Sequence, residues 1–337
     1  MNVLSALYGA AASWRRRWYA RDPARQRHLS RPVISVGNLR VGGSGKTPIV
    51  AHLARLLRAR GEHPAILSRG YARTRPSSGV TVVSDGQRIL TDLAAAGDEP
   101  LMLARALPGV PVLVGADRFL SGQLAEHQFG ATVHLLDDGF QHVGLAREVD
   151  LVLVDEGDLS DRVLPMGRLR EPLAHARVAD AVLITAAETA SAAAVARALE
   201  APVWFRVTRS LGAPRYVTGE SGGPAPAGRV FAMAAIARPD RFFADLAAAG
   251  YHVTGVLAFG DHHAYTQRDA DRVAARARAS GTTTILTTEK DAVRIEHLDW
   301  RGLSVADVPL VVAVEPAAQF AEWLAAHLVQ TPRLPHS

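Results

Sequence analysis

Residues 33–48 read VISVGNLRVGGSGKTP, an apolar run that leads through a glycine-rich turn to a lysine and a threonine. An apolar strand followed by such a turn and a helix start is the arrangement whose backbone N–H groups bind nucleotide phosphates. Glycine supplies the backbone freedom of the turn, and Pro48 is tolerated in the first helical turn. The segment therefore predicts a phosphate-binding loop between a strand and a helix.

Lysine is rare in this chain, since only two of its 38 Lys and Arg residues are lysines, Lys46 and Lys290. A compact ammonium at Lys46 suits the β- and γ-phosphates of a nucleotide, and the hydroxyl of Thr47 suits Mg²⁺. The strict pattern begins with glycine where this chain has Arg40, and a turn without ligand is the alternative. The predicted nucleotide-binding residues are Gly42, Gly43, Ser44, Gly45, Lys46 and Thr47.

Apolar runs alternate with helical patterns along the chain. Continuous rather than alternating apolar strands indicate burial on both faces. We expect an α/β fold, with a P-loop NTPase-like, mostly parallel sheet covered by helices and a second, smaller α/β domain. The expected strands are Val33–Val36, Ala65–Leu67, Val112–Val114, Val133–Leu136, Leu151–Val154, Ala181–Ile184, Val230–Ile236, Val253–Phe259, Thr284–Thr287 and Leu310–Val314.

Composition changes after Val207, where residues 208–228 are rich in Gly, Pro and Ser. Such a stretch is typical of a connector. We therefore expect an amphipathic helix within 1–29, a P-loop domain over 30–207, a linker over 208–228 and the smaller domain over 229–337.

The N-terminal segment combines apolar and basic residues. Leu4, Leu7, Ala11, Trp14 and Trp18 share one helical face, and arginines flank it. The charges follow the apolar stretch, which is the reverse of a secretory signal. A basic helix with tryptophans favours an anionic membrane surface, and a helix packed on its own domain is the alternative.

Bulk properties exclude several classes of protein. The chain has no cysteine, which excludes disulfide frameworks and thiolate metal sites, and no apolar run of 18 residues that could span a bilayer. Its net charge of +5 suggests an anionic partner, but dispersed arginines and the absence of a recognisable module argue against nucleic acid.

Two acidic motifs extend the phosphate-site hypothesis. HLLDDGFQH at 134–142 ends a strand with Asp137 and Asp138, either of which suits Mg²⁺, although Asp-Gly is also ordinary turn chemistry. GDEP at 97–100 places Asp98 and Glu99 before a proline, and a helix cap alone explains that pattern.

Two further motifs lie in the second half. DHHAYT at 261–266 follows an expected strand, and a histidine there could orient a general base or belong to an ordinary surface loop. TTEKD at 287–291 holds Lys290, to which the sequence assigns no role.

Seven motifs in register resemble the tetraacyldisaccharide 4′-kinase (lipid A 4′-kinase) family between about residues 30 and 295. They are VGNLRVGGSGKTP, LSRGY, GDEP, HLLDDGFQH, LPMGRLREP, DHHAYT and TTEKDAVRI. The resemblance implies two α/β domains and transfer of the ATP γ-phosphate, with Mg²⁺, to the 4′-hydroxyl of a lipid A disaccharide precursor. It also implies peripheral association with the cytoplasmic face of a Gram-negative inner membrane, through the N-terminal helix, and no obligate protein partner.

The resemblance also implies residue roles. Asp98 corresponds to the catalytic base, His262 (with His263 beside it) to its histidine partner, and Lys46 to the phosphate-binding lysine. Residues Thr47, Glu99, Asp137 and Asp138 correspond to the metal region, and Arg69, Tyr71, Arg118, Gln141 and Glu171 to the substrate site. Arg168 and Arg238 depart from the family pattern. The alternative is a membrane-docked P-loop nucleotide switch, but such switches carry a lysine where this chain has Val41.

Overall fold

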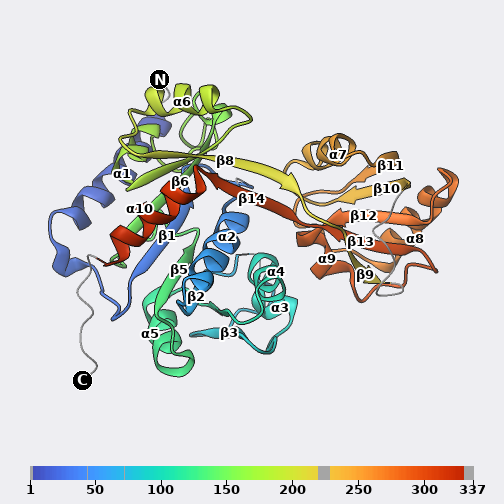
Figure 1. Cartoon of the computed structure of the whole chain (residues 1–337), viewed down its shortest axis with the longest axis horizontal. Coiled ribbons are helices and arrows are strands. Elements are labelled where there is room, and N and C mark those ends of the chain that lie inside the picture. The colour runs from blue at the N-terminus through green and yellow to red at the C-terminus, as the bar shows by residue number, and fades with distance from the viewer. Residues whose placement is uncertain (1–2, 44, 72, 219–227, 330–337) are drawn as a thin grey trace. The chain divides into compact units, whose positions relative to one another are not determined.

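A nine-stranded sheet with the order β14-β8-β7-β6-β1-β5-β2-β4-β3 forms the larger part of the fold (Figure 1). The computed structural model describes residues 3–43, 45–71, 73–218 and 228–329. The strands of this sheet are β1 (Val33–Asn38), β2 (Pro64–Ser68), β3 (Thr81–Asp85), β4 (Pro111–Val114), β5 (Val133–Asp137), β6 (Val149–Asp155), β7 (Ala181–Thr185), β8 (Trp204–Leu211) and β14 (Leu310–Glu315).

Parallel pairing dominates the sheet. β1 lies between β5 and β6, with Val36 opposite Asp137 on one side and Leu151 on the other, and β3 is antiparallel to its neighbour β4. Every residue of β1, β2, β4 and β5 is buried, as expected for strands covered on both faces. The predicted α/β class with a mostly parallel sheet is confirmed.

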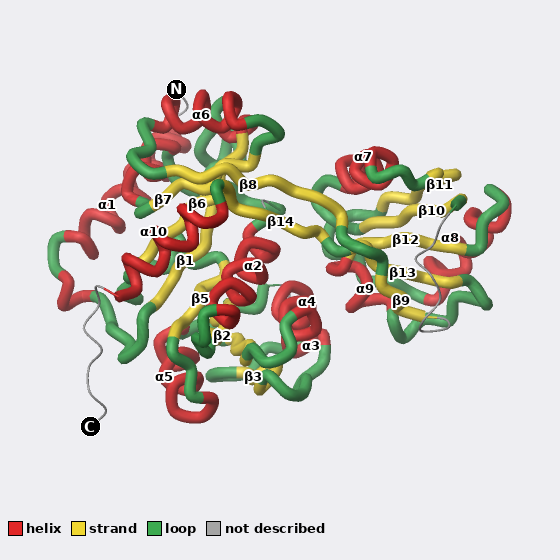
Figure 2. Tube along the Cα trace, in the orientation of Figure 1, coloured by secondary structure: helices red, strands yellow, loops and turns green. Residues whose placement is uncertain are grey.

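The helices of this part cover the sheet (Figure 2). Its core includes one hydrophobic cluster under α5, around Leu67, Leu113 and Leu136, and another under α6, around Val152 and Val182. The helices are α1 (Val3–Ala20), α2 (Lys46–Ala59), α3 (Leu93–Ala96), α4 (Asp98–Ala106), α5 (Arg118–Phe129), α6 (Thr189–Leu199) and α10 (Ala317–Val329), with short 3₁₀ turns η1 (Pro23–Arg25), η2 (Glu156–Asp158) and η3 (Leu173–Val178).

A five-stranded sheet with the order β11-β10-β12-β13-β9 forms the second part. β10, β11, β12 and β13 are parallel, and β9 is antiparallel to β13. The strands are β9 (Arg215–Thr218), β10 (Arg229–Ala234), β11 (His252–Ala258), β12 (Thr284–Thr288) and β13 (Ser304–Val308), and the helices are α7 (Pro239–Ala248), α8 (Gln267–Ala279) and α9 (Glu289–Ile295). The second, smaller α/β domain is therefore present as predicted.

Contacts divide the chain into two compact units. Unit 1 comprises 1–96, 103–208 and 312–337, and unit 2 comprises 97–102 and 209–311. The expected boundaries differ from these in three places. Residues 97–102, expected in the P-loop domain, belong to unit 2. The stretch expected as a linker contains the end of β8 and all of β9. Residues from 312 onwards belong to unit 1 because β14 pairs with β8, and Phe320 of α10 packs on Phe205 at 5.0 Å between ring centroids.

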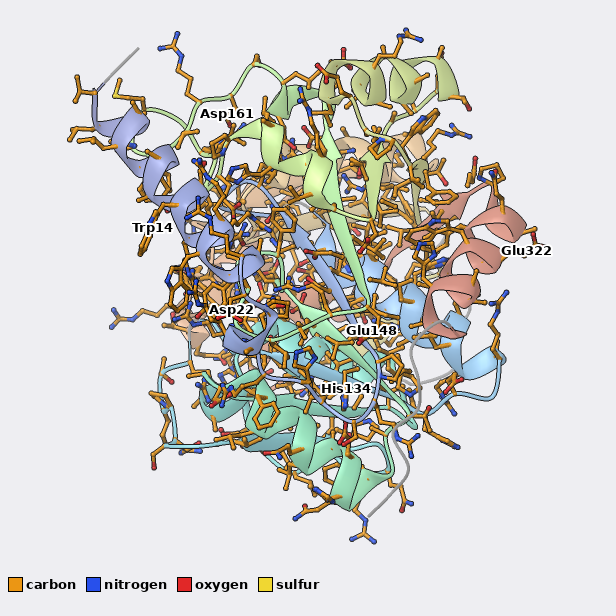
Figure 3. All side chains as sticks on the ribbon, turned by 90° about the vertical axis from the view of Figure 1, so that its left-hand side faces the viewer. Trp14, Asp22, His134, Glu148, Asp161 and Glu322 are labelled. Atoms are coloured by element: carbon orange, nitrogen blue, oxygen red, sulfur yellow. The ribbon has the colours of Figure 1, made fainter. Side chains whose placement is uncertain are left out.

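Helix α1 packs on unit 1 through one face only. Ser5 donates a hydrogen bond to the Val163 carbonyl at 2.8 Å, and Gly9 is buried against Pro172. The opposite, apolar face is exposed, and Figure 3 shows the Trp14 side chain on the outer side of the helix. Within the described ranges, no helix combines the length and apolar character that crossing a membrane requires.

Candidate active site

The predicted phosphate loop joins β1 to α2 in unit 1. Gly42 and Gly45 adopt φ values of 93° and 86°, in the left-handed region that favours glycine. Gly45 is the N-cap of α2 and provides no side chain to occupy the N–H groups of the first turn. A helix start without a side-chain cap is an arrangement that suits an anion. Ser44 lies outside the described residues.

The side chain of Lys46 is held over the loop by neighbouring oxygens. Its Nζ donates to Asn38 Oδ1 at 2.9 Å and lies 3.4 Å from Asp138 Oδ1. Burial lowers the pKa of Lys46, and the charge of Asp138 partly opposes that shift. A phosphate would bring further negative charge to this buried ammonium, so the lysine is suited to bind one.

The acidic pair lies where β5 ends, beside the loop. Asp137 is buried and accepts a hydrogen bond from Ser68 Oγ at 3.5 Å. Asp138 adopts φ 56°, a backbone conformation that is uncommon outside glycine and is concentrated at functional sites. Burial raises the pKa of Asp138, but Lys46 and Arg170 together hold it well below its usual range. Asp138 is therefore an ionised carboxylate within reach of the loop.

Arg170 belongs to this cluster although no role was assigned to it from the sequence. Its guanidinium contacts both oxygens of Asp138, at 3.0 and 2.7 Å, and Asn38 Oδ1 at 2.5 Å. The signal was present in the LPMGRLREP motif, in which Arg168 and Glu171 drew attention instead. The side chain of Arg168 pairs with Asp161 on the surface, at 2.8 Å.

Arg40 stands where the strict loop motif has its first glycine, and its side chain makes buried ion pairs. Its buried guanidinium pairs with Asp158 at 2.7 Å and with Asp155 at 2.8 Å. The flanking main chain is bonded to the segment that carries Arg170, from Val41 N to Arg168 O and from Arg170 N to Leu39 O. Arg40, which replaces the first glycine of the strict motif, therefore anchors the loop.

The residues expected to line the substrate site separate into two groups. Arg118 is buried at the start of α5, and burial together with Arg69 lowers its pKa to about 10. Gln141 donates to the Asn38 carbonyl at 3.0 Å, while Arg69 and Tyr71 are exposed.

The carboxylate of Glu171 is bound by Arg16, a residue of α1. It accepts from Arg16 at 2.5 Å and contacts His175 Nδ1 at 2.7 Å. The structure thus gives Glu171 an anchoring contact with the N-terminal helix.

The second cluster lies in unit 2, which includes the first turn of α4. Asp98 is buried, and its Oδ2 lies 2.8 Å from His262 Nδ1. His262 adopts φ 59° in the loop after β11. Glu99, expected near a metal, is paired with Lys290 at 2.8 Å.

The two adjacent histidines differ in their contacts. His263 bonds to Asp269 at 3.1 Å and stacks on Phe259, so it supports the start of α8 rather than Asp98. Arg238, the other departure from the family pattern, is the N-cap of α7 and does not cap it through its side chain, as the expected asparagine could.

Comparison with known proteins gives one consistent result. A family model described as tetraacyldisaccharide-1-P 4′-kinase matches residues 1–329. Tetraacyldisaccharide 4′-kinase of Geobacter metallireducens is 42% identical over 300 residues, covering 88% of each chain, and that of Koribacter versatilis is 40% identical over 324 residues, covering 94% of this chain and 95% of the relative. The crystal structure of an "apo" form of LpxK from Aquifex aeolicus in complex with ATP aligns with a TM-score of 0.77 and 30% identity, covering 96% of this chain and 97% of that one.

Proposed function

The chain belongs to the tetraacyldisaccharide-1-P 4′-kinase family, and from that premise we propose how its own residues carry out the reaction. It is an ATP-dependent kinase of lipid A biosynthesis that phosphorylates the 4′-hydroxyl of a tetraacyldisaccharide 1-phosphate. The predicted family and activity are confirmed, and the alternative of a nucleotide switch gains no support.

ATP is the phosphate donor in this proposal. The N–H groups at the start of α2 bind its phosphates, and Lys46 reaches the β- and γ-phosphates. The ATP complex of the Aquifex aeolicus relative supports this assignment. Arg118 and Arg170 add positive charge around Asp138, which suits the charge that develops on a transferring phosphoryl group.

The loop end of β5 fits a Mg²⁺ ion by the chemistry of its donors. The described residues contain no group of three or more His, Cys, Asp or Glu that could hold a metal by themselves. Nucleotide Mg²⁺ sites need only one or two carboxylates because phosphates and water complete the coordination. Asp137, Asp138 and the hydroxyl of Thr47 supply such oxygens, and a bound Mg²⁺ would neutralise charge on the β- and γ-phosphates.

Asp98 receives the proton of the sugar hydroxyl. The observation that carries this role is the 2.8 Å contact between Asp98 and His262, which fixes the carboxylate at the start of α4. Burial raises the pKa of Asp98, yet hydrogen bonds and charge from Arg294 and His262 bring it below its usual value. A weakly basic carboxylate is adequate here because phosphoryl transfer passes through a loose transition state, which depends on positioning more than on base strength.

The acceptor reaches the enzyme from a membrane surface in this proposal. Leu4, Leu7, Trp14 and Trp18 form the exposed apolar face of α1, and Arg15 and Arg17 are exposed beside them. A basic helix with this pattern lies in the headgroup region of an anionic bilayer. Because ATP is found in the cytoplasm, the proposed reaction takes place on the cytoplasmic face of an inner membrane, to which α1 attaches the enzyme peripherally.

One assay tests the proposed reaction. The enzyme is incubated with γ-labelled ATP, Mg²⁺ and an acylated glucosamine disaccharide 1-phosphate in detergent, and the lipid is separated from the aqueous products. We expect label in the lipid, at the 4′-position by mass spectrometry, and none with Lys46→Ala. Label found only as free phosphate would favour the switch instead.

A separate measurement tests membrane attachment. The wild type should sediment with vesicles containing anionic phosphatidylglycerol, and a Trp14→Ser/Trp18→Ser double variant should remain largely in the supernatant. The double variant should still transfer label to the substrate in detergent. Equal sedimentation of both proteins would refute the role of α1.

A further inference from the structure

Helix α9 places two basic residues against the pair formed by Asp98 and His262. The side chains of Arg294 and Lys290 approach that pair from the same helix. We propose that both are positioning residues for the kinase reaction: Arg294 orients the Asp98 carboxylate, and Lys290 fixes the His262 ring and Glu99. This inference rests on the proposed role of Asp98 as proton acceptor.

Arg294 binds Asp98 through two parallel hydrogen bonds. Its Nε donates to Oδ1 at 2.8 Å, and its Nη2 donates to Oδ2 in a closer contact. This fork matches the planar geometry of a carboxylate and leaves it little rotational freedom. An aspartate held by a lysine alone would lack that orientation.

The contacts distinguish the two oxygens of Asp98. Oδ2 accepts from Arg294 and faces His262 Nδ1, whereas among the residues that the structure describes Oδ1 is bonded by Arg294 alone. An ionised carboxylate offers about two acceptor positions on each oxygen. The remaining position on Oδ1 is therefore the one that receives the proton as the sugar oxygen bonds to the γ-phosphorus and the bond to the ADP oxygen breaks.

Arg294 is itself held by buried groups. Its Nη1 lies 3.4 Å from Asp291 Oδ1 and 3.4 Å from the Ala235 carbonyl. Asp291 is fully buried and accepts from Ala235 N at 3.0 Å and from Thr288 Oγ1 at 2.7 Å. These bonds join the ends of β10 and β12 to α9, so the guanidinium is carried by a rigid frame, as a positioning group requires.

Lys290 determines which nitrogen of a neutral His262 carries the proton. Its Nζ lies 3.2 Å from His262 Nε2 and 2.8 Å from Glu99 Oε1. An ammonium can only donate, so in a neutral ring Nε2 accepts and the proton lies on Nδ1. Nδ1 lies 2.8 Å from Asp98 Oδ2 and 3.1 Å from Nη2 of Arg294, and of these two atoms only the carboxylate oxygen can accept that proton. Nδ1 is then the donor to Asp98 Oδ2, which gives the second of the two lysines a role.

A double-mutant cycle tests whether Arg294 acts through Asp98. Label transfer is measured for Arg294→Ala, Asp98→Ala and the double variant, with Arg301→Ala as the control, since Arg301 is exposed and pairs with Asp271 and Asp299. We expect Arg294→Ala to lower kcat by about 10–10²-fold with the KM for ATP unchanged, because a misplaced reacting group costs that much. In the Asp98→Ala background the same change should cost nothing further.

Arg294→Lys is the second variant, for the case that Arg294→Ala does not fold, because it keeps a positive charge beside Asp291. It should fold, as judged by thermal unfolding, and lose part of the turnover because the fork is lost. If Arg294→Ala does not fold, Arg294→Lys takes its place in the cycle. An undiminished kcat, or an equal loss with and without Asp98, would overturn the inference; full activity of Asp98→Ala would instead refute the proposed base.

The pH profile provides a readout that a purely structural role would not move. The charged groups facing Asp98 are Arg294 and Lys290 of α9, and the titratable group facing it is His262 of the loop after β11. Without Arg294, burial still raises the pKa of Asp98 and less opposes it, so the acidic limb of kcat/KM should move to higher pH. An unmoved limb would contradict the proposal.

Lys290 is tested by a matched pair of variants. Lys290→Met removes the donor to Nε2 and should lower kcat by about tenfold, a fraction of the usual contribution of a positioned acid or base. Lys290→Arg keeps a donor-only side chain and should recover part of the loss. Wild-type turnover of Lys290→Met, or equal losses of turnover in both variants, would show that Lys290 does not determine which nitrogen of the His262 ring carries the proton.

Discussion

The guanidinium of Arg16 lies 3.6 Å from the centroid of the Phe140 ring. Phe140 follows Asp138 by two positions in the sequence. The same side chain donates to the Phe140 carbonyl at 2.9 Å and to Glu171 at 2.5 and 3.2 Å. One arginine of α1 therefore joins the N-terminal helix to the segments that carry Asp138 and Arg170. The helix proposed to meet the membrane is thus fastened to the phosphate site of its own unit.

Arg16→Ala should destabilise the protein by about 2–4 kcal/mol, because it removes a largely buried ion pair and a cation–π contact. Arg17→Ala is the matched control, since Arg17 is exposed and its side chain bonds to the Ser13 carbonyl of its own helix. Denaturant unfolding measures both. Equal losses of free energy would show that the Arg16 contacts contribute nothing specific.

Arg40→Gly, which restores the strict loop motif, should also destabilise the protein. It leaves Asp155 and Asp158 without their buried partner, and breaking such a pair costs about 3–5 kcal/mol. The pair of the exposed Arg168 with Asp161 provides the control, and Arg168→Ala should cost about 1 kcal/mol or less. A more stable Arg40→Gly variant would mean that the loop does not need this anchor.

His142 should make the fold sensitive to mild acid. Burial, with Arg118 and Arg147, lowers its pKa to about 4, against about 6.5 in an unfolded chain. The unfolded state therefore binds the proton first as the pH falls, so stability present above pH about 6.5 is lost between there and pH about 4.

The loss of unfolding free energy at His142 should be about 1–3 kcal/mol, allowing for its partial exposure. His142→Asn should remove that share of the pH dependence, and the exposed His127→Asn should not. Unfolding free energies at pH 4.5, 5.5 and 7 provide the comparison. Identical slopes for wild type and His142→Asn would contradict the assignment.

His262→Ala and His263→Ala should separate the two histidines of the DHHAYT motif. His262 contacts Asp98, so its loss should lower kcat by about 10–10²-fold. His263 contacts Asp269 and Phe259, so its loss should change stability slightly and kcat little. Steady-state kinetics with the lipid acceptor tests this, and the reverse order of effects would be incompatible with the geometry.

Local signals made the first half of the fold predictable from sequence. The strand, glycines and lysine of the phosphate loop are contiguous, so β1, the loop and the start of α2 could be placed directly. The pairing of Asp98 with His262 was expected only through the family resemblance. Nothing in the local sequence connects two residues 164 positions apart.

Tertiary contacts account for what the sequence did not reveal. Arg294 lies 196 positions from Asp98, and Arg170 lies 32 positions from Asp138, so neither pairing has a local pattern. β9 lies in a stretch rich in Gly, Pro and Ser, and pairs antiparallel with β13, where Arg215 also contacts Asp307. The return of β14 and α10 to unit 1 likewise depends on pairing with β8.

Turnover of Asp98→Ala tests the central claim most directly, that this carboxylate receives the proton of the acceptor hydroxyl. Transfer of label from γ-labelled ATP to the acylated disaccharide should fall by about 10²–10⁴-fold, the usual contribution of a positioned base, while ATP affinity stays nearly unchanged. Normal turnover in this variant, with ATP bound as in the wild type, would contradict the claim.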